Sequence, residues 1–361
     1  MSYIVAIETA VPKHCHTKES FANFFSNATE DASIKRKIKI VSDKAMIETR
    51  YSVLKDYSLT SDKFEFYEKN KNLLPEPTLT KRMAVYQKEA ILLSIDAVKN
   101  IKGIEKIKNS ITHLITVTCT GMFAPGLDIE LIRNLNLNAN IDRSSINFMG
   151  CNAAILALKQ ADTICKSNPN AKVLIVCTEL CTLHFQKQYS DDYLLSNMLF
   201  GDGCAAVLVS STPNEIANTK AIKIDSFNSL ILHNGYNDMA WQLSETGFIM
   251  NLTSYVSTLI KENIKTMLDS LTINPNTIDY WAIHPGGKKI VDDFFETLHL
   301  DKSKAAESYD VLKNYGNMSS PTVLFVLKQV IEKANSKKGE TIFSAAFGPG
   351  LSIETMQLSY A

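Results

Sequence analysis

The sequence predicts an α/β protein made of two duplicated halves, each of the βαβαβ type. Short runs of β-branched and other apolar residues alternate with helical stretches along the 361 residues, a pattern typical of sheets covered by helices. Three pairs of segments also match, in the same order, between the two parts of the chain. With 45% apolar residues, the chain can bury a large core.

The three pairs share local patterns: a buried strand before a glycine-containing loop, a turn that opens an apolar helix, and a Phe-Gly-x-Gly turn before a strand. In that order they are THLITVTCTG (112–121) with DYWAIHPGG (279–287), GCNAAILALKQ (150–160) with GNMSSPTVLFVLKQ (316–329), and FGDGCAAVLVS (200–210) with FGPGLSIETMQL (347–358). We therefore predict an N-terminal half, residues 1–217, and a C-terminal half, residues 218–361, related by a pseudo-twofold axis.

Apolar stripes at helical spacing predict two further core-facing helices. Their residues are Met83, Tyr86, Ala90, Leu93 and Ala97 in one segment, and Leu252, Val256, Leu259 and Leu268 in the other. The stretch 17–80 contains the Lys-rich segment 34–44 as well as Pro75 and Pro77. We interpret this stretch as an insertion that covers the functional site of the N-terminal half.

Charge and composition exclude several classes of function. Lys plus Arg and Asp plus Glu are equal at 38 each, which does not favour nucleic-acid binding. The N-terminus lacks the features of a secretory signal, and no apolar run approaches bilayer length, so we expect a cytoplasmic protein without membrane contact. Seven scattered cysteines without a CxxC pair indicate neither a disulfide framework nor a metal site.

Ligand sites in α/β sheets gather at the carboxyl ends of strands and at helix N-termini. The duplicated loops therefore predict one shared site lined by Cys119, Cys151, His284 and Asn317. Cys151 follows the strand-like SSINFMG and opens an apolar helix, where free N–H groups and the helix dipole favour a thiolate. Taken alone, such a cysteine is more often a buried core residue.

His284 and Asn317 have ordinary interpretations when each is considered singly. A histidine in a His-Pro-Gly-Gly turn is usually solvated or a capping residue, and an asparagine before a helix is usually an N-cap or a turn residue. Together with Cys151 they form a different set: a thiol that can accept an acyl group and two neutral donors for a thioester oxygen. Such donors stabilise the enolate formed when a malonyl thioester loses carbon dioxide.

With these residues in place, the whole chain resembles the type III polyketide synthases, the chalcone synthase-like family of the thiolase-fold superfamily. The motifs that carry the resemblance are SDKAMIETRY (42–51), CTGMFAPGLD (119–128), GCNAAILAL (150–158), VLIVCTEL (173–180), LFGDGCAAVLV (199–209), IHPGG (283–287), YGNMSS (315–320) and FGPGLSIET (347–355). The resemblance implies a thiolase-like αβαβα layered fold, a homodimer, and acyl-CoA starter and malonyl-CoA substrates without a further cofactor. It also implies decarboxylative Claisen condensation by a triad of Cys151, His284 and Asn317.

The resemblance further places Phe200 as an active-site aromatic residue that orients the malonyl group. A second aromatic residue of the plant enzymes is replaced by Met250, and Trp241 stands where those enzymes keep a glycine. A tryptophan there fills volume and should restrict chain extension. We therefore do not expect chalcone itself as the product.

Four more positions are implied to contact substrate: Cys119, Cys181 and His184, where threonines are usual, and Ser319 of the YGNMSS motif. The family's coenzyme A-binding positions fall on Lys37 and Lys44, whereas an expected arginine appears as Ile40. Lys288 and Lys289 could meet the phosphates instead. Ala124 replaces the methionine that would reach into the partner subunit's cavity.

Three alternatives remain open at this point. A β-ketoacyl-ACP synthase III-like enzyme would use the same residues but take malonyl from a carrier protein. A Cys-His-Asn hydrolase lacks support because the local Cys-Gly-Ser-Cys-Trp context is missing. A non-catalytic acyl-CoA-binding partner subunit would have lost the nucleophile or a donor, whereas all three residues are present.

Overall fold

The computed structural model describes residues 1–213, 215–216, 220–253, 255–334 and 337–361. Its main sheet has nine strands in the order β11-β12-β13-β8-β1-β7-β6-β4-β5. These strands are β1 (Ser2–Ala10), β4 (His113–Thr118), β5 (Asp142–Asn147), β6 (Lys172–Leu180), β7 (Asp202–Ser210), β8 (Ile222–Ile231), β11 (Tyr280–Ile283), β12 (Thr341–Gly348) and β13 (Ser352–Tyr360). Two small antiparallel ribbons join β2 (His14–Thr17) with β3 (Thr49–Ser52) and β9 (Met239–Ser244) with β10 (Gly247–Leu252).

The helices of the described residues lie between and around these strands. They are α1 (Lys18–Asn27), α2 (Ala32–Ala45), α3 (Leu79–Lys99), α4 (Ile104–Ile107), α5 (Leu127–Leu135), α6 (Ala153–Ser167), α7 (Asp191–Leu199), α8 (Val256–Ser270), α9 (Lys288–Thr297), α10 (Ala306–Tyr315) and α11 (Thr322–Lys333).

The strand order confirms the duplication. Reading outward from the middle of the sheet, β1-β7-β6-β4 in the first half is matched by β8-β13-β12-β11 in the second. The two half-sheets meet where β1 pairs with β8 over only three residue pairs. The predicted boundary between residues 217 and 218 lies outside the described residues, so the division at that position stays a prediction.

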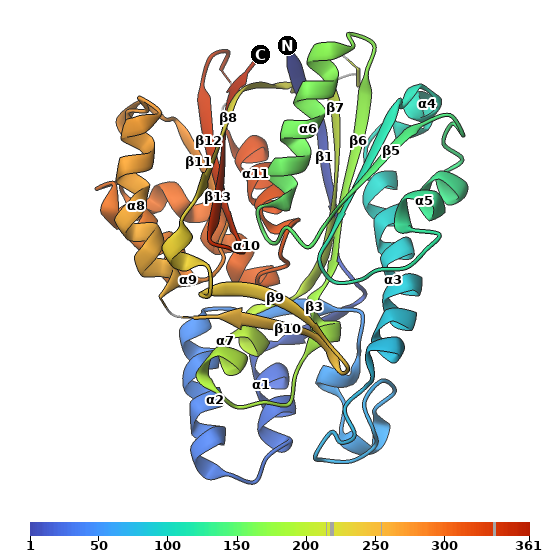
Figure 1. Cartoon of the computed structure of the whole chain (residues 1–361), viewed down its shortest axis with the longest axis vertical. Coiled ribbons are helices and arrows are strands. Elements are labelled where there is room, and N and C mark those ends of the chain that lie inside the picture. The colour runs from blue at the N-terminus through green and yellow to red at the C-terminus, as the bar shows by residue number, and fades with distance from the viewer. Residues whose placement is uncertain (214, 217–219, 254, 335–336) are drawn as a thin grey trace.

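The layers are those expected of the αβαβα arrangement. Helices α6 and α11 lie between the half-sheets, α3 and α5 cover the outer side of the first, and α8 and α9 cover the outer side of the second (Figure 1). Alanines at positions 153, 157 and 161 are fully buried on α6. Their small side chains let this central helix pack closely against the strands on either side.

One predicted helix needs a correction. The stripe from Tyr86 to Ala97 lies on α3 and is buried, as expected. Leu252, however, is the last residue of β10 rather than part of α8, which begins at Val256. Leu252 pairs across the ribbon with Met239, so strand pairing holds it extended although its spacing fits the helical stripe.

The segment 17–80 contains α1, α2 and β3. Helix α2 packs on α7, and α7 packs on β10, so these elements and the β9–β10 ribbon gather below the main sheet (Figure 1). No helix in the described part of the chain is long and apolar enough to cross a membrane.

Both chain ends lie at the end of the strands that is opposite this region. Ser2 of β1 and Tyr360 of β13 both pair with β8, with Ile224 and Ile222 respectively. The other end of β1, Ala10, pairs with Cys204, close to Phe200. The termini therefore lie side by side at the far end of the strands (Figure 1).

Candidate active site

Cys151 lies in the turn between β5 and α6, two residues before the helix begins at Ala153. Gly150 immediately before it has a φ of 83°, and a Cβ at this position would lie 2.1 Å from Cδ of Pro349. The glycine therefore permits both the left-handed backbone and the close approach of the 349 loop. Cys151 is 6% exposed.

The protonation of Cys151 differs from the expectation at a helix start. Burial raises the pKa of its thiol to about 11, although hydrogen bonds from Ser319 and Asn317 act in the opposite direction. The thiol form is therefore favoured in the substrate-free site near neutral pH. Desolvation of the thiolate outweighs the favourable helix N-terminus.

His284 follows the last residue of β11, and its backbone N–H donates to the carbonyl of Ala345 at 2.8 Å. Both ring nitrogens are buried and have no hydrogen-bond partner among the described residues. Burial lowers the pKa of His284 to about 3, so the imidazole is neutral. A neutral imidazole can accept a proton at one nitrogen and donate from the other.

Asn317 presents its side-chain amide to Cys151, whose Sγ lies 4.0 Å from Oδ1. Its Oδ1 accepts from the backbone N–H of Ser319 at 2.8 Å and from the Thr322 hydroxyl at 3.4 Å. This fixes the amide orientation, and Nδ2 then lies 3.9 Å from Sγ of Cys151 and 3.5 Å from the carbonyl oxygen of Gly286. The donor thus stands between the nucleophile and the loop that follows His284.

The loop that carries Phe200 is joined to the Asn317 loop by backbone hydrogen bonds. Asn317 N–H donates to the Leu199 carbonyl at 3.0 Å, and the N–H of Gly201 donates to the Asn317 carbonyl at 2.9 Å. Gly316, with a φ of 70°, allows this crossing because a Cβ there would lie 2.9 Å from the Leu199 oxygen. The aromatic residue and the amide donor are therefore positioned together.

A small cavity of about 20 Å³ adjoins Cys151. Seven of the residues predicted from the sequence line it: Cys119, Cys151, Cys181, Phe200, Trp241, Met250 and Ser319. They come from both halves of the duplicated fold. We refer to this space as the Cys151 cavity.

Trp241 and His184 are held firmly beside it. Trp241 lies directly opposite Met250 in the β9–β10 ribbon, and its Nε1–H donates to the Cys119 carbonyl at 2.6 Å. The His184 ring stacks on Phe248 with centroids 4.2 Å apart. Trp241 is therefore a fixed wall of the cavity.

His184 does not line the Cys151 cavity. Its Nε2 lies 2.7 Å from the Thr120 carbonyl, and its Nδ1 accepts from the backbone N–H of Phe248 at 3.0 Å. Burial lowers its pKa to about 3. Because both nitrogens already have partners, His184 does not offer a ring nitrogen to substrate.

The predicted coenzyme A lysines fall into two groups. Lys44, Lys288 and Lys289 line an open groove of about 410 Å³ that also contains Gly286 and Gly287 and so reaches the His284 loop. Lys288 pairs with Asp292, and Lys289 lies 3.8 Å from Asp293. Lys37 is outside the residues that line this groove and pairs with Asp191 at 3.0 Å.

Two buried charged residues near the site were missed by the sequence interpretation. Glu179 accepts from the N–H of Cys119 at 2.8 Å and from the hydroxyls of Thr120 and Ser320 at 2.8 and 2.7 Å. Burial raises its pKa to about 7. A carboxylate at the end of the apolar run VLIVCTEL was the available signal, since such residues are rarely buried without partners.

Arg50 is the second buried charged residue that the sequence interpretation missed. It is 1% exposed and donates from Nη1 to the Phe200 carbonyl at 3.3 Å, while its guanidinium lies 4.2 Å from the centre of the Phe21 ring. It therefore supports the Phe200 loop from behind. The sequence offered no comparable signal, because Arg50 stands in a polar stretch.

Among the described residues, no group of three or more His, Cys, Asp or Glu side chains could hold a metal ion. The seven cysteines are all free. The functional groups described at the site are a thiol, a neutral imidazole and an amide.

The fold and this site define a condensing enzyme of the acyltransferase type. The sequence family model for the N-terminal domain of chalcone and stilbene synthases matches residues 1–213, and the model for their C-terminal domain matches residues 223–360. The chain therefore belongs to the type III polyketide synthase family, the chalcone and stilbene synthases.

Individual relatives agree with this assignment. The chain is 31% identical to the alpha-pyrone synthesis polyketide synthase-like Pks18 of Mycobacterium tuberculosis, over 99% of this chain and 90% of the relative. It is 30% identical to the probable polyketide synthase 1 of Dictyostelium discoideum, over 98% of this chain but only 11% of that protein.

Solved structures show the same fold. The brown algal PKS-I of Ectocarpus siliculosus superposes with a TM-score of 0.90 at 26% identity, covering 100% of this chain and 98% of that one. The C-terminal type III domain of Steely1 from Dictyostelium gives 0.89 at 28% identity, covering 99% of each chain. The thiolase-like fold is thus confirmed, and the carrier-dependent alternative is not favoured.

Proposed function

We propose that this enzyme condenses malonyl-CoA, with loss of carbon dioxide, onto an acyl starter held as a thioester on Cys151. The observation that carries the proposal is the contact between the buried Cys151 thiol and the Asn317 amide, 3.9 Å apart, with Asn317 also touching the loop that follows His284, whose buried ring nitrogens are unpaired among the described residues. His184, the other buried histidine that the described residues place in this region, has both ring nitrogens engaged.

Loading of the starter begins with a proton transfer. The neutral His284 takes the proton of the Cys151 thiol as Sγ attacks the acyl-CoA carbonyl. The thioester bond to coenzyme A then breaks, the coenzyme A thiolate leaves and is protonated, and the acyl group remains on Cys151. The same imidazole supplies that proton.

Extension uses the two donors on a second thioester. His284 and Asn317 donate to the carbonyl oxygen of malonyl-CoA while its carboxylate leaves as carbon dioxide, and the electron pair becomes an enolate. The enolate carbon attacks the acyl-Cys151 carbonyl, and Cys151 leaves as a thiolate. The product is a β-ketoacyl-CoA that is two carbons longer.

The position of Phe200 supports a role beside the malonyl group. Its backbone is tied to Asn317, and its ring lines the Cys151 cavity. An aromatic wall favours the neutral product of decarboxylation over the carboxylate that precedes it. Trp241 and Met250 limit the space, so we assign short acyl starters and few extensions.

The groove lined by Lys44, Lys288 and Lys289 is the proposed path of the coenzyme A arm. Its walls between the lysines are apolar, including Leu199, Leu252 and Val256. Such a surface suits a pantetheine chain, and the lysine ammonium groups suit the phosphates. Lys37, engaged with Asp191 outside the groove, is the weakest of the four assignments.

We further propose a cytoplasmic homodimer that needs no metal or redox cofactor. Strand β5 is at the end of the sheet and, in the described part of the chain, pairs with β4 alone. The exposed Met122 and Met149 lie in the loops beside it. An open edge flanked by apolar side chains is suited to pairing with a second copy. Sedimentation of the purified chain at the monomer mass would exclude this assembly.

The central test is incubation of the purified chain with malonyl-CoA and a panel of short acyl-CoA starters, without a carrier protein, followed by mass spectrometry. We expect acyl-enzyme and condensed products from the native chain and neither from Cys151→Ala. Cys165→Ala, which removes a buried thiol outside the site, is the matched control and should retain both. Products that persist in Cys151→Ala, or strict dependence on a carrier protein, would contradict the proposal.

A further inference from the structure

The residue that follows the nucleophile ties the Cys151 turn to the second half of the fold. Asn152 is 1% exposed and stands at the N-cap position of α6. Asparagine at such a position usually caps the helix with its side chain. Here the side chain makes no capping hydrogen bond among the described residues. The carboxamide is used for a different contact.

That contact is with Ser352, the first residue of β13. Asn152 Nδ2 donates to the Ser352 hydroxyl at 2.8 Å, and this hydroxyl donates to the Pro349 carbonyl at 3.1 Å. Because the hydroxyl proton is already used, Oγ accepts from the amide, which fixes the orientation of the carboxamide. Its Oδ1 is buried and has no hydrogen-bond partner within the described ranges. An apolar residue would avoid this unpaired atom, so stability alone does not account for an asparagine here.

The turn that joins β12 to β13 packs against the residues on both sides of the nucleophile. A Cβ at Gly348 would lie 2.6 Å from Cγ of Asn152, so the glycine leaves room for the carboxamide. On the other side of Cys151, Gly150 packs on Pro349, with 2.1 Å between a Cβ at Gly150 and the proline Cδ. The Cys151 turn therefore cannot move without displacing the β12–β13 turn.

Strand β12 of the same hairpin also holds the backbone of His284. Its N–H donates to the carbonyl of Ala345, three residues before Gly348 on this strand. The position of the Cys151 turn and that of the His284 backbone are therefore both set by the β12–β13 hairpin. The nucleophile belongs to the first half of the fold and the histidine to the second, so this hairpin aligns the two halves.

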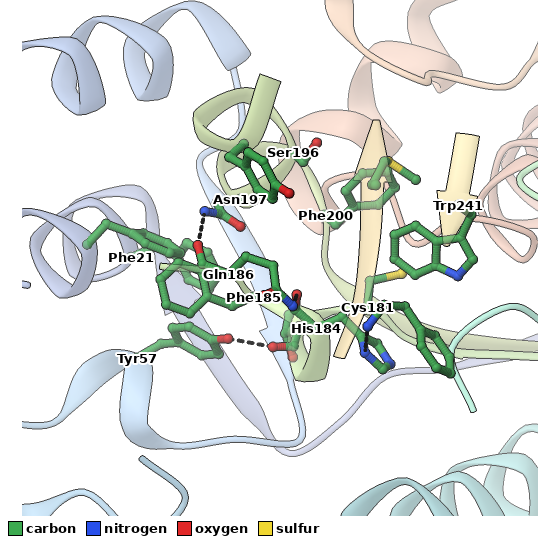
Figure 2. Close-up of a pocket in the computed structure, with 15 residues that line it drawn as sticks. Phe21, Tyr57, Cys181, His184, Phe185, Gln186, Ser196, Asn197, Phe200 and Trp241 are labelled. Carbon is green, nitrogen blue, oxygen red and sulfur yellow. Dashed lines mark hydrogen bonds between the residues drawn. The ribbon is translucent and has the colours of Figure 1, made fainter. Parts of the chain in front are cut away.

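Asn152 acts on the site only through its neighbours. It is not among the described residues that line the Cys151 cavity, whereas Pro349, Phe200 and Trp241 are, the last two of which are shown in Figure 2. A bound acyl group would therefore meet the thiol and the cavity wall, and not the carboxamide of Asn152.

From these contacts we propose that Asn152 is a positioning residue, whose hydrogen bond to Ser352 fixes the Cys151 thiol relative to His284 for proton transfer. This inference rests on the proposed loading step, in which His284 takes the proton of Cys151. Small displacements of reacting groups are sufficient to slow such a step strongly. No bond to Asn152 forms or breaks during the reaction.

The first measurement is the rate at which a short acyl-CoA forms the acyl-enzyme, followed by rapid quenching and mass spectrometry. Asn152→Ala and Ser352→Ala should each slow this rate about 10- to 100-fold. The double variant should be no slower than the slower single variant, because both changes remove the same hydrogen bond. Ser352→Ala leaves α6 unaltered, so it tests the bond even where Asn152→Ala does not fold.

The second measurement distinguishes positioning from a general loss of structure. Iodoacetamide alkylates Cys151 without substrate, and near neutral pH the rate should depend on His284, because burial raises the pKa of the thiol to about 11. Asn152→Ala should slow alkylation of the Cys151 peptide in the native background and have no further effect in His284→Gln. A structural role would change the rate by the same factor in both backgrounds.

Asn134→Ala is the matched control, since Asn134 is exposed on α5 and its Nδ2 donates to the Glu130 carbonyl of the same helix. Both of its rates should equal those of the native chain. Native rates in Asn152→Ala and Ser352→Ala, or equal slowing of alkylation with and without His284, overturn the inference and leave the proposed condensation intact. A native chain that forms neither acyl-enzyme nor condensed product overturns both, so the two failures are distinguishable.

Discussion

Two backbone hydrogen bonds hold Asn317 in place, and its side-chain oxygen accepts from the Ser319 N–H and the Thr322 hydroxyl. The side-chain amide therefore has a fixed orientation beside Cys151, and its rotation would break the bonds from Ser319 and Thr322. His284 is the opposite case, with ring nitrogens that make no protein hydrogen bond in the described part of the chain. One donor is preorganised, and the other is kept available for substrate and for proton transfer.

This difference predicts how the two donors respond to substitution. His284→Gln and Asn317→Ala should each slow decarboxylation of malonyl-CoA by about 100-fold or more, as expected for loss of an oxyanion donor. Asn317→Ala should affect the loading of Cys151 much less, because loading depends on the base. Carbon dioxide release and acyl-enzyme formation, measured separately, test this, and unimpaired decarboxylation in both variants would contradict the donor roles.

Trp241 should set the upper limit on product length. Trp241→Ala removes the indole from the wall of the Cys151 cavity together with its hydrogen bond to the Cys119 carbonyl. We therefore expect additional malonyl units in the products, read by mass spectrometry. Leu243→Ala is the control on the same strand, since Leu243 is 57% exposed. An unaltered product length in Trp241→Ala would show that other residues limit extension.

The site residues differ in how far the sequence could locate them. The duplicated pattern is sufficient to predict that Cys151, His284 and Asn317 belong to one site, because corresponding loops of duplicated halves meet at the axis. The pKa of Cys151 is not predictable in this way, since it depends on how much apolar surface from distant segments surrounds the thiol. Arg50 was missed for the same reason: only the packed structure shows what lies beside it.

At the scale of elements, the crossing of the 199–201 and 315–317 loops is the contact that joins Phe200 to Asn317. Gly316 makes this crossing possible through its positive φ and the absence of a side chain. Either loop alone would be an ordinary connection. Their backbone hydrogen bonds convert them into one rigid part of the site.

Gly316→Ala should therefore destabilise the protein by about 1–3 kcal/mol and reduce condensation, because the added Cβ meets the Leu199 oxygen in a strained backbone conformation. Gly103→Ala is the matched control: its φ is 82°, but the nearest atom would be 3.8 Å away. Urea denaturation of each variant measures its loss of free energy of unfolding. Equal losses of stability would mean that backbone strain alone, not the loop contact, accounts for the effect.

The β9–β10 ribbon shows that hydrophobic spacing alone can assign a residue to the wrong element. The spacing of Leu252 fits a helical stripe, yet its position is decided by pairing with Met239. Ribbons of this kind depend on cross-strand contacts, and their short strands carry a weak periodic signal. By contrast, α3 shows a stripe long enough for its helix to be predicted correctly.

At the scale of the whole molecule, two buried carboxyl groups make stability depend on pH. Burial raises the pKa of Glu179 from 4.5, and that of Asp202 from 3.8, to about 7 in both cases. The folded state therefore keeps protons that the unfolded state releases. The contribution of these two carboxyl groups to the free energy of unfolding is complete at acid pH, below their pKa values in the unfolded chain. It is lost as the pH rises through about 7, their pKa in the folded state.

Glu179→Gln should reduce this dependence. Relative to the native chain, the variant should gain up to about 3 kcal/mol in free energy of unfolding between pH 4.5 and pH 8. Urea denaturation at both pH values gives the difference, with exposed Glu19→Gln as the control. A constant difference across this range would mean that Glu179 is already ionised at low pH in the folded state.

The position of the chain ends has a practical consequence. Ser2 and Tyr360 are held on the same strand, β8, at the end of the sheet remote from Phe200. A peptide linker of a few residues could join them, and new ends could be opened in an exposed loop elsewhere. Circularly permuted or surface-immobilised versions of this synthase should thus keep the entrance to Cys151 unobstructed.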